Sequence, residues 1–408
     1  MPHFWLDRHL LNAIQKRAPA PIRLGLEPGS ESSHAPLSML PTIRVKDRRT
    51  LLALLSNPDI NFGDLYSAGR IEVKGDLVRL LEELYKTPES TTSRIVSRLS
   101  RLIPSNSMRA SRKNIHHHYD LSTDFYQLWL DPQLVYTCAY FPDRNTTLEQ
   151  AQQAKLDLVC RKLWLRPGET VVEAGCGWGA LAIHMAKFYG VRVKAFNISR
   201  EQIAFAREQT CREGLGSLVE FHEDDYRNIS GKSDAFVSIG MLEHVGRSHY
   251  REFARVIDRT IGQRGRGLLH FIGRNYPHPL HPWITKRIFP GGYVPALGEV
   301  AEIFEPYDFS MLDVENLCTH YAKTLEFWLS RFEQSYEQLA ERFGTAFARM
   351  WRLYLAGSTA AFRTGTLQLF QIVFAGRACD SRPWNREYLY NNSALQNERE
   401  VKWTRVMF

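Results

Sequence analysis

The chain lacks the features of a membrane-spanning or secreted protein. Its 408 residues contain no apolar run close to the roughly 20 residues that a membrane-spanning helix needs. Residues 1–8 lack the apolar core of a secretory signal. Cysteine is scarce, and the six cysteines are scattered without metal-site spacing: Cys138, Cys160, Cys176, Cys211, Cys318 and Cys379. We therefore expect reduced thiols in a cytoplasmic protein rather than a disulfide framework.

Internal repeats and low-complexity tracts are also missing. The apolar fraction of 44% and the charged fraction of 24% are ordinary for a globular protein. The length predicts one large and one small domain, enough to bury a full core. The formal net charge of +8 is compatible with nucleic acid, with an anionic membrane face, or with no charged partner.

The sequence pattern divides the protein into four segments. Residues 1–90 predict a small α+β domain, with a strand and turn over 71–76 and a helix over 77–86. Residues 91–113 form a basic stretch without an acidic residue, which is either a solvated linker or a membrane-surface helix. Residues 114–390 form the large domain, and 391–408 form a C-terminal tail.

Strand and helix patterns alternate from about residue 150 to 272. The expected strands are 170–173, 191–196, 218–222, 235–239 and 267–272. The expected helices are 149–163, 180–189, 200–213 and 248–261. Such alternation predicts an α/β fold with a mostly parallel sheet, whose ligands bind beyond the carboxyl ends of the strands. Beyond this region we expect a loop over 278–297 and aromatic-rich helices over 313–372.

A glycine-rich turn follows the first of these strands. Residues 173–179 read Glu-Ala-Gly-Cys-Gly-Trp-Gly, an acid at a strand end, a turn and then a helix. Glycine lets the backbone turn sharply and approach a ligand closely. The G-x-G-x-G spacing after an acid suits a ligand with an ammonium and a ribose but no phosphate, such as S-adenosylmethionine. A dinucleotide turn or a plain strand-to-helix turn remain alternatives, because one glycine-rich turn is weak evidence.

Ten ordered segments lie between residues 118 and 357: HYDLSTDFYQLWLD (118–131), YTCAYF (136–141), LEQAQQAKLDLVCRKL (148–163), EAGCGWG (173–179), DDYRNI (224–229), VSIGMLEHVG (237–246), LLHFIG (268–273), IFPGGYVP (288–295), HYAKTLEFW (320–328) and WRLYLAG (351–357). Together they resemble the bacterial cyclopropane-fatty-acyl-phospholipid synthase family. The first 90 residues resemble the family's small N-terminal domain more weakly.

The resemblance implies a fold, a reaction and partners. The fold is a Rossmann-like class I methyltransferase domain with a mostly parallel seven-stranded sheet. The reaction methylates a cis double bond in a phospholipid acyl chain with S-adenosylmethionine, and loss of a proton from the resulting carbocation closes a cyclopropane ring. The implied setting is the cytoplasmic face of the cell membrane, with peripheral contact to anionic lipid, and the implied assembly is a homodimer. No nucleic-acid partner is expected.

The resemblance also implies the residues of the site. A bound bicarbonate removes the proton, and it is held by Cys138 through its backbone amide, Glu243, His270 and Tyr321, with a backbone contact from Ile272. Glu243 accepts the hydroxyl hydrogen of bicarbonate, and His270 and Tyr321 donate to it. The donor site comprises Tyr136, Thr137, Glu173, Gly175, Gly177, Trp178, Asn197, Gln202, Asp225 and Tyr226. Asn197 departs from the short hydroxyl residue frequent in the family, which leaves its ribose contact open.

Electron-rich rings stabilise cations at close range, and this protein is rich in candidates. They are Tyr136, Tyr140, Phe141, Trp178, Tyr321, Phe327 and Trp328. Core packing is the alternative for each ring. His116–His118 has no spaced partner for a metal site, so no metal is expected. Ser358 stands where relatives often have cysteine, so that thiol is dispensable here.

Other functions remain alternatives. The main one is methylation at carbon of the acyl chain without ring closure, which gives methyl-branched, methylene or hydroxylated products. Methylation of small amines, a catalytically silent lipid-binding module and a nucleic-acid methyltransferase are weaker, and the last lacks the expected base-binding motif. The acyl length, double-bond position and headgroup stay open.

Overall fold

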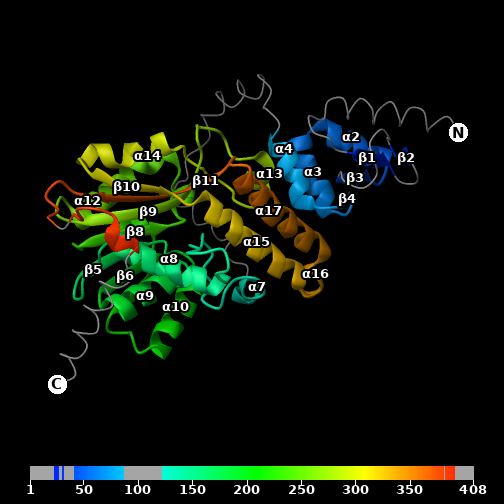
Figure 1. Cartoon of the computed structure of the whole chain (residues 1–408). Helices are drawn as coiled ribbons and strands as arrows, with labels where there is room; N and C mark the ends of the chain where they lie inside the picture. The colour runs from blue at the N-terminus through cyan, green and yellow to red at the C-terminus, as the bar shows by residue number, and fades with distance from the viewer. Residues whose placement is uncertain (1–22, 27–29, 32–40, 87–121, 381, 391–408) are drawn as a thin grey trace.

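The computed structural model describes residues 23–26, 30–31, 41–86, 122–380 and 382–390. The predicted basic stretch, His116–His118 and the C-terminal tail lie outside these residues. The described residues build a small N-terminal sheet and a large sheet, joined by long helices (Figure 1). No helix in the described part of the protein is both long and apolar enough to cross a membrane.

The large sheet has seven strands in the order β10-β11-β9-β8-β5-β6-β7. Their bounds are β5 Thr170–Ala174, β6 Arg192–Asn197, β7 Val219–Glu223, β8 Ala235–Ile239, β9 Arg266–Gly273, β10 Ser310–Asn316 and β11 Gln368–Ala375. Strands β5 to β9 run parallel, and β11 lies antiparallel between β9 and β10. The predicted mostly parallel, seven-stranded sheet is confirmed.

Helices cover both faces of this sheet. On one face the core contains residues of α8, α9 and α10, and on the other it contains residues of α12 and α14. Their bounds are α8 Leu148–Lys162, α9 Ala180–Tyr189, α10 Arg200–Arg212, α12 Tyr250–Ile261 and α14 Leu297–Phe304. Thr147 starts α8 with a capping box, and left-handed Gly190 ends α9, as expected for a glycine stop.

The five strands and four helices expected between residues 149 and 273 are all present, with ends shifted by at most two residues. The expectation of helices alone over 313–372 is wrong. Three helices do lie there: α15 Cys318–Gln334, α16 Tyr336–Phe343 and α17 Thr345–Arg363. Strands β10 and β11 flank them and complete the large sheet. Because all eight residues of β11 are buried, the strand has no alternating pattern to reveal it.

The N-terminal unit packs along α17, from Arg349 near its start to Arg363 at its end. It contains a sheet ordered β2-β1-β3-β4, with bounds Ser30–Glu31, Arg23–Leu26, Thr42–Val45 and Ile71–Lys74. Its helices are α2 Arg48–Ser56, α3 Pro58–Ser67 and α4 Leu77–Lys86, and α3 and α4 contact α17. Arg349 of α17 donates to the carbonyls of Tyr66 and Ile71 at 2.7 and 2.9 Å.

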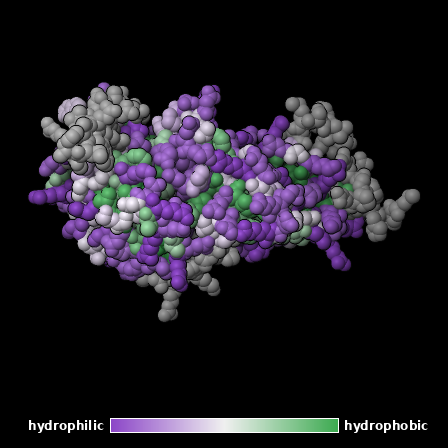
Figure 2. Space-filling model, turned by 90° about the horizontal axis from the view of Figure 1, so that it is seen from below, coloured by the Kyte–Doolittle hydropathy of each residue, from purple (hydrophilic) through white to green (hydrophobic). Residues whose placement is uncertain are grey.

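The surface is mostly hydrophilic on the face seen in Figure 2, where apolar patches lie between polar side chains. Leu52 and Leu55 of α2 are among the exposed large apolar residues. Scattered exposed apolar residues are normal for a folded protein and need no special function.

Candidate active site

The glycine-rich turn begins where β5 ends at Ala174. Gly175, Gly177 and Gly179 have φ values of 84°, 53° and 86°, in the region that favours glycine. The amides of Gly175 and Cys176 both donate to the carbonyl of Phe196 on β6. A Cβ at Gly179 would lie 2.8 Å from Cβ of Ala206, which is too close. The turn therefore depends on glycine and packs tightly under α9 and α10.

Two adjoining cavities lie at the carboxyl ends of the parallel strands. They share Gly175, Asn197, Met241 and His244 in their walls. The first is also lined by predicted donor-site residues: Tyr136, Thr137, Glu173, Gly177, Trp178 and Gln202. The second is also lined by Asp225 and Tyr226. The structure thus brings all ten predicted donor-site residues around one continuous site.

Two buried ionisable side chains, Glu173 and Lys155, lie at one end of the first cavity. Glu173 is buried, and its Oε2 atom has no hydrogen-bond partner. Burial raises the pKa of Glu173 to about 8, against the opposing charge of Lys155. Burial likewise lowers the pKa of Lys155 to about 8. The Lys155 ammonium donates to Thr137 Oγ1 at 3.0 Å, so it anchors the 135–137 segment over this end of the cavity.

Asn197 and Gln202 form the middle of the site. Asn197 Nδ2 donates to Gln202 Oε1 at 2.6 Å and to the carbonyl of Gly177 at 3.2 Å. Its Oδ1 accepts from the amide of Ser199. Asn197 therefore ties the end of β6 to both the glycine turn and α10, a bridging task that a short hydroxyl side chain would not complete.

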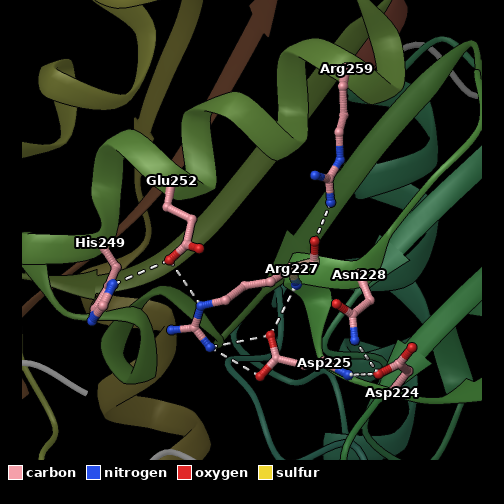
Figure 3. A network of polar contacts seen from close by, with 7 residues as sticks. All are labelled: Asp224, Asp225, Arg227, Asn228, His249, Glu252 and Arg259. Atoms are coloured by element: carbon pink, nitrogen blue, oxygen red, sulfur yellow. Dashed lines mark hydrogen bonds and ion pairs between the residues drawn. The ribbon is translucent and has the colours of Figure 1, made fainter. Parts of the chain in front are cut away.

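An ion-pair network supports the wall of the second cavity (Figure 3). Arg227 donates to both carboxylate oxygens of Asp225, at 3.2 and 3.0 Å, and its Nε donates to Glu252 on α12 at 3.0 Å. The Arg227 guanidinium also lies 4.8 Å from the centre of the Tyr226 ring. The network fixes the 224–228 loop against α12, and with it the shape of the cavity.

The five predicted anion-site residues are not among those that line the two cavities, but Cys138 and Glu243 are chain neighbours of the lining residues Thr137 and His244. Glu243 on α11 (Leu242–Val245) accepts a hydrogen bond at Oε1 from the amide of Ile272, at 2.6 Å. Its Oε2 is buried without a partner. Burial raises the pKa of Glu243 to about 7, which the Ile272 bond partly offsets. The structure thus joins the carboxyl end of β8 directly to β9.

His270 lies two residues before Ile272 on β9, so both side chains face the same side of the sheet. Gln371 Nε2 lies 3.0 Å from His270 Nδ1, and His270 Nε2 is buried without a partner. Burial, with the charges of Lys155 and Lys162, holds the pKa of His270 well below its usual range. The ring is therefore neutral at physiological pH.

Cys138 and Tyr321 are linked through Leu317. The Cys138 thiol lies 4.0 Å from the Leu317 carbonyl, which also accepts from the amide of Tyr321. The amide of Leu317 in turn donates to Leu369, the cross-strand neighbour of Ile272. Burial raises the pKa of the Cys138 thiol far above its usual range, so the thiol is no nucleophile. A short series of contacts, most of them between backbone groups, therefore links Cys138, Tyr321, Ile272 and Glu243.

The predicted aromatic residues separate into two groups. Tyr136 and Tyr321 both contact Trp328, with ring centres 5.2 and 5.9 Å apart. Tyr140 and Phe141 instead stack on His320, and Phe141 stacks on Phe327. The first group adjoins the donor cavity through Tyr136, and Trp178 also lines that cavity. Trp178 packs against Tyr126 with ring centres 4.8 Å apart.

Several site residues were missed by the sequence reasoning. Lys155, Met241 and His244 line the first cavity, and Tyr354 of α17 forms a 2.9 Å hydrogen bond with Tyr136. Burial lowers the pKa of His244 to about 4. The signal for His244 was its place directly after Glu243 at a strand end, whereas Lys155 lies in a helix that gives no local sign of burial. Among the described residues no cluster suited to hold a metal ion is found.

The residues present fit S-adenosylmethionine. The unpaired Glu173 carboxylate oxygen suits an ammonium group, and a Cβ at Gly177 would meet no atom within 4 Å, which leaves open space beside the turn. Asn197 and Gln202 offer amide groups in the middle of the site, where a ribose would lie.

Comparison with known proteins gives a consistent result. The family model described as mycolic acid cyclopropane synthetase matches residues 106–372. The chain is 34% identical to a probable fatty acid methyltransferase of Pseudomonas putida, over 91% of this chain and 96% of that protein. It is 42% identical to the cyclopropane-fatty-acyl-phospholipid synthase of Escherichia coli strain K12, over 63% of this chain and 66% of that protein.

Solved structures agree with these sequence matches. The cyclopropane synthase MmaA2 from Mycobacterium tuberculosis superposes with a TM-score of 0.62 at 30% identity, covering 67% of this chain and 99% of that one. The mycolic acid cyclopropane synthase CmaA1, complexed with SAH and CTAB, gives a TM-score of 0.61 at 31% identity, covering 64% of this chain and 97% of that one.

Fold and site together define a class I methyltransferase that depends on S-adenosylmethionine. Within that class, the chain belongs to the mycolic acid cyclopropane synthetase family.

Proposed function

We propose that the protein transfers a methylene group from S-adenosylmethionine to the cis double bond of an unsaturated phospholipid acyl chain and forms a cyclopropane ring. One observation carries this proposal: Glu243 Oε2 and His270 Nε2 are both buried without partners. A carbocation in a hydrocarbon tail needs a base held beside it, whereas methylation of an amine does not. The relative in Escherichia coli, which is named cyclopropane-fatty-acyl-phospholipid synthase, supports the choice of substrate.

S-adenosylmethionine, when bound, supplies an electrophilic methyl group. We assign Glu173 to its ammonium, Asn197 and Gln202 to the ribose, and Asp225 and Tyr226 to the adenine edge and face. Gly175, Gly177 and Trp178 form the turn against which it rests. Tyr136 and Thr137 close the methionine end, with Thr137 held by Lys155. These groups bind, orient and exclude water, which is what a weakly nucleophilic alkene requires.

Bicarbonate, when bound, supplies the base that removes the proton. Glu243 would accept its hydroxyl hydrogen at Oε2, because Oε1 is already engaged by the Ile272 amide. His270 and Tyr321 would donate hydrogen bonds to it. The backbone amide of Cys138 is a further donor. A carboxylic group whose pKa is about 7 can accept or share a proton near neutral pH, which suits this role.

Two rings offer stabilisation to the positive charge on the acyl group. Tyr136 and Tyr321 both pack against the fully buried Trp328. Ring faces attract cations, by roughly 2 kcal/mol or more where water is excluded. The same rings provide an apolar surface for a hydrocarbon tail.

The test uses purified protein, vesicles of cis-unsaturated phospholipid and methyl-labelled S-adenosylmethionine. We expect acyl groups heavier by one CH₂ that take up no hydrogen on mild catalytic hydrogenation. Vesicles of saturated phospholipid serve as the control. Turnover at fixed pH should fall when bicarbonate is removed from the buffer. Label found only on amines or nucleobases, or no label in lipid at all, would refute the proposal.

A second candidate function is methylation at carbon of the acyl group without ring closure. It is favoured by the Pseudomonas putida relative, which matches nearly the whole chain and is named a probable fatty acid methyltransferase. A methylene-branched product has the same added mass but retains a double bond, so it would take up hydrogen. Hydrogenation therefore separates the two functions in the same assay.

Membrane contact and a homodimer complete the proposal. The basic residues between Arg94 and Lys113 are our candidates for the contact, since each basic residue near an anionic leaflet contributes about 1 kcal/mol. Replacing Arg94, Arg98 and Arg101 by glutamate should weaken sedimentation with anionic vesicles and leave donor affinity unchanged. Equal binding by this variant would show that the stretch is only a linker.

A further inference from the structure

A row of polar side chains crosses three adjacent strands of the large sheet. Glu315 on β10 lies opposite Gln371 on β11, and Gln371 lies opposite His270 on β9. Residues directly opposite each other in antiparallel strands have their side chains on the same face. Lys162 of α8 covers this row: its ammonium donates to Gln371 Oε1 at 2.7 Å and to Glu315 Oε2 at 2.5 Å.

The chemistry of Lys162 fixes the orientation of the Gln371 amide. An ammonium group only donates hydrogen bonds, so the amide atom that faces it must be the oxygen. The amide nitrogen of Gln371 then faces His270 Nδ1, at 3.0 Å. Since this nitrogen also only donates, Nδ1 must be the unprotonated acceptor. The proton of the neutral imidazole therefore lies on Nε2.

The row is well protected from rearrangement. Gln371 is fully buried and Lys162 is 1% exposed, so water does not offer either group a replacement partner. A buried ammonium requires an opposite charge nearby, and Glu315 provides it. Turning the Gln371 amide over would set its NH₂ group against the Lys162 ammonium, and the ammonium would keep only Glu315 as an acceptor.

We propose that Lys162 and Gln371 are positioning residues that hold His270 in the Nε2-protonated tautomer, so that a hydrogen-bond donor is kept in the anion site. The use of that donor rests on the proposed function, but the tautomer itself does not. Neither residue touches the reacting groups. They affect the site only by fixing the position of the proton on the His270 ring.

The activity of Gln371→Glu tests whether Lys162 and Gln371 set the tautomer of His270. A carboxylate in place of the amide still accepts a hydrogen bond from Lys162, but it can only accept a hydrogen bond from His270. The ring proton therefore moves to Nδ1, and Nε2 becomes unprotonated. We expect kcat to fall by roughly a hundred-fold at mildly alkaline pH, with the KM for the methyl donor changed less than about three-fold. The matched control is Gln368→Glu on the same strand, which contacts Asn316 and Gly365 rather than His270.

The loss in Gln371→Glu should shrink as the pH falls. The introduced carboxylate favours the imidazolium, which carries a proton on each nitrogen and so regains the Nε2 donor. Around the ring, Lys155 and Lys162 of α8 oppose this protonation, whereas Glu315 of β10 and Glu243 of α11 are the nearby acids. Gln371→Met, which can neither donate nor accept strongly, should show no such recovery.

Nitrogen NMR of protein labelled with ¹⁵N-histidine reads the tautomer directly. The His270 signals are assigned by their loss in His270→Gln. We expect an unprotonated Nδ1 and a protonated Nε2 in the natural protein, and the reverse in Gln371→Glu. A protonated Nδ1 in the natural protein, or an unchanged tautomer in the variant, refutes the proposal that Lys162 and Gln371 set the tautomer of His270. If the tautomer reverses but ring formation keeps its rate, that proposal holds and the proposed use of the His270 donor fails.

Discussion

Replacing Glu243 by glutamine should make the ligand-free protein more stable and the enzyme much slower. The unfolded carboxyl has an ordinary pKa of 4.5, and burial raises the pKa of the folded group to about 7. The folded protein therefore binds this proton more tightly than the unfolded chain. The resulting stabilisation is complete below pH 4.5 and is lost as the pH rises through about 7.

The size of the effect follows from the same two pKa values. At about 1.4 kcal/mol per pH unit, the interval from 4.5 to about 7 amounts to about 3 kcal/mol of unfolding free energy. Glu243→Gln does not titrate, and its amide oxygen still accepts from the Ile272 amide. The variant should therefore gain up to about 3 kcal/mol over the natural protein at pH 7 and above. Its rate of ring formation should fall by about a hundred-fold or more.

Urea unfolding at a series of pH values measures the stability, and the lipid assay measures the rate. Glu341→Gln is the matched control, because Glu341 is exposed on α16 and makes no contact with the site. Its unfolding curve should follow that of the natural protein. If Glu243→Gln shows the same pH dependence of stability as the natural protein, the carboxyl is not held in the buried environment described here. If it retains full activity, Glu243 has no part in the reaction.

Three further predictions concern the donor site and α17. Gly179→Ala should destabilise the protein by about 1–3 kcal/mol and weaken donor binding, because its Cβ would meet Ala206; thermal unfolding that matches the natural protein would contradict this. Lys155→Met should weaken donor binding several-fold in calorimetry through the lost bond to Thr137, whereas the exposed Lys194→Met should not. Ser358→Cys should stay within a few-fold of the natural rate, and a large gain would show that a thiol there is catalytic.

The parallel half of the fold could be predicted because each strand is a short apolar run that ends in a glycine or polar turn. Strand β8, for example, lies over 235–239 as expected. The two antiparallel strands were missed for opposite reasons. β11 is buried throughout, so it shows no alternation; β10, at the edge, has no fully buried residue, and its alternation is broken by a register shift between Met311 and Asp313.

The donor site was predictable because most of its residues lie at or directly after the ends of strands β5, β6 and β7, which all meet at one edge of the sheet. The supporting polar residues were not. Lys155 and Lys162 belong to a helix whose charged residues appear solvated in the sequence, and only the packing of α8 on the sheet buries them. Gln371 gains its His270 partner from a strand that lies about a hundred residues away in sequence. Such contacts exist only after the sheet has formed.

The row of Glu315, Gln371 and His270 also bears on how the protein finds its correct strand pairing. β9 and β11 are almost wholly apolar and buried, so packing alone would tolerate a shifted alignment of one against the other. A shift by one residue would turn Gln371 to the opposite face and leave the buried Lys162 without its amide acceptor, and a shift by two would separate Gln371 from both neighbours. A buried polar group that loses its hydrogen-bond partner costs about 1–3 kcal/mol. The polar row thus favours one alignment of β11, a strand that is separated in the chain from its neighbour β10 by three helices.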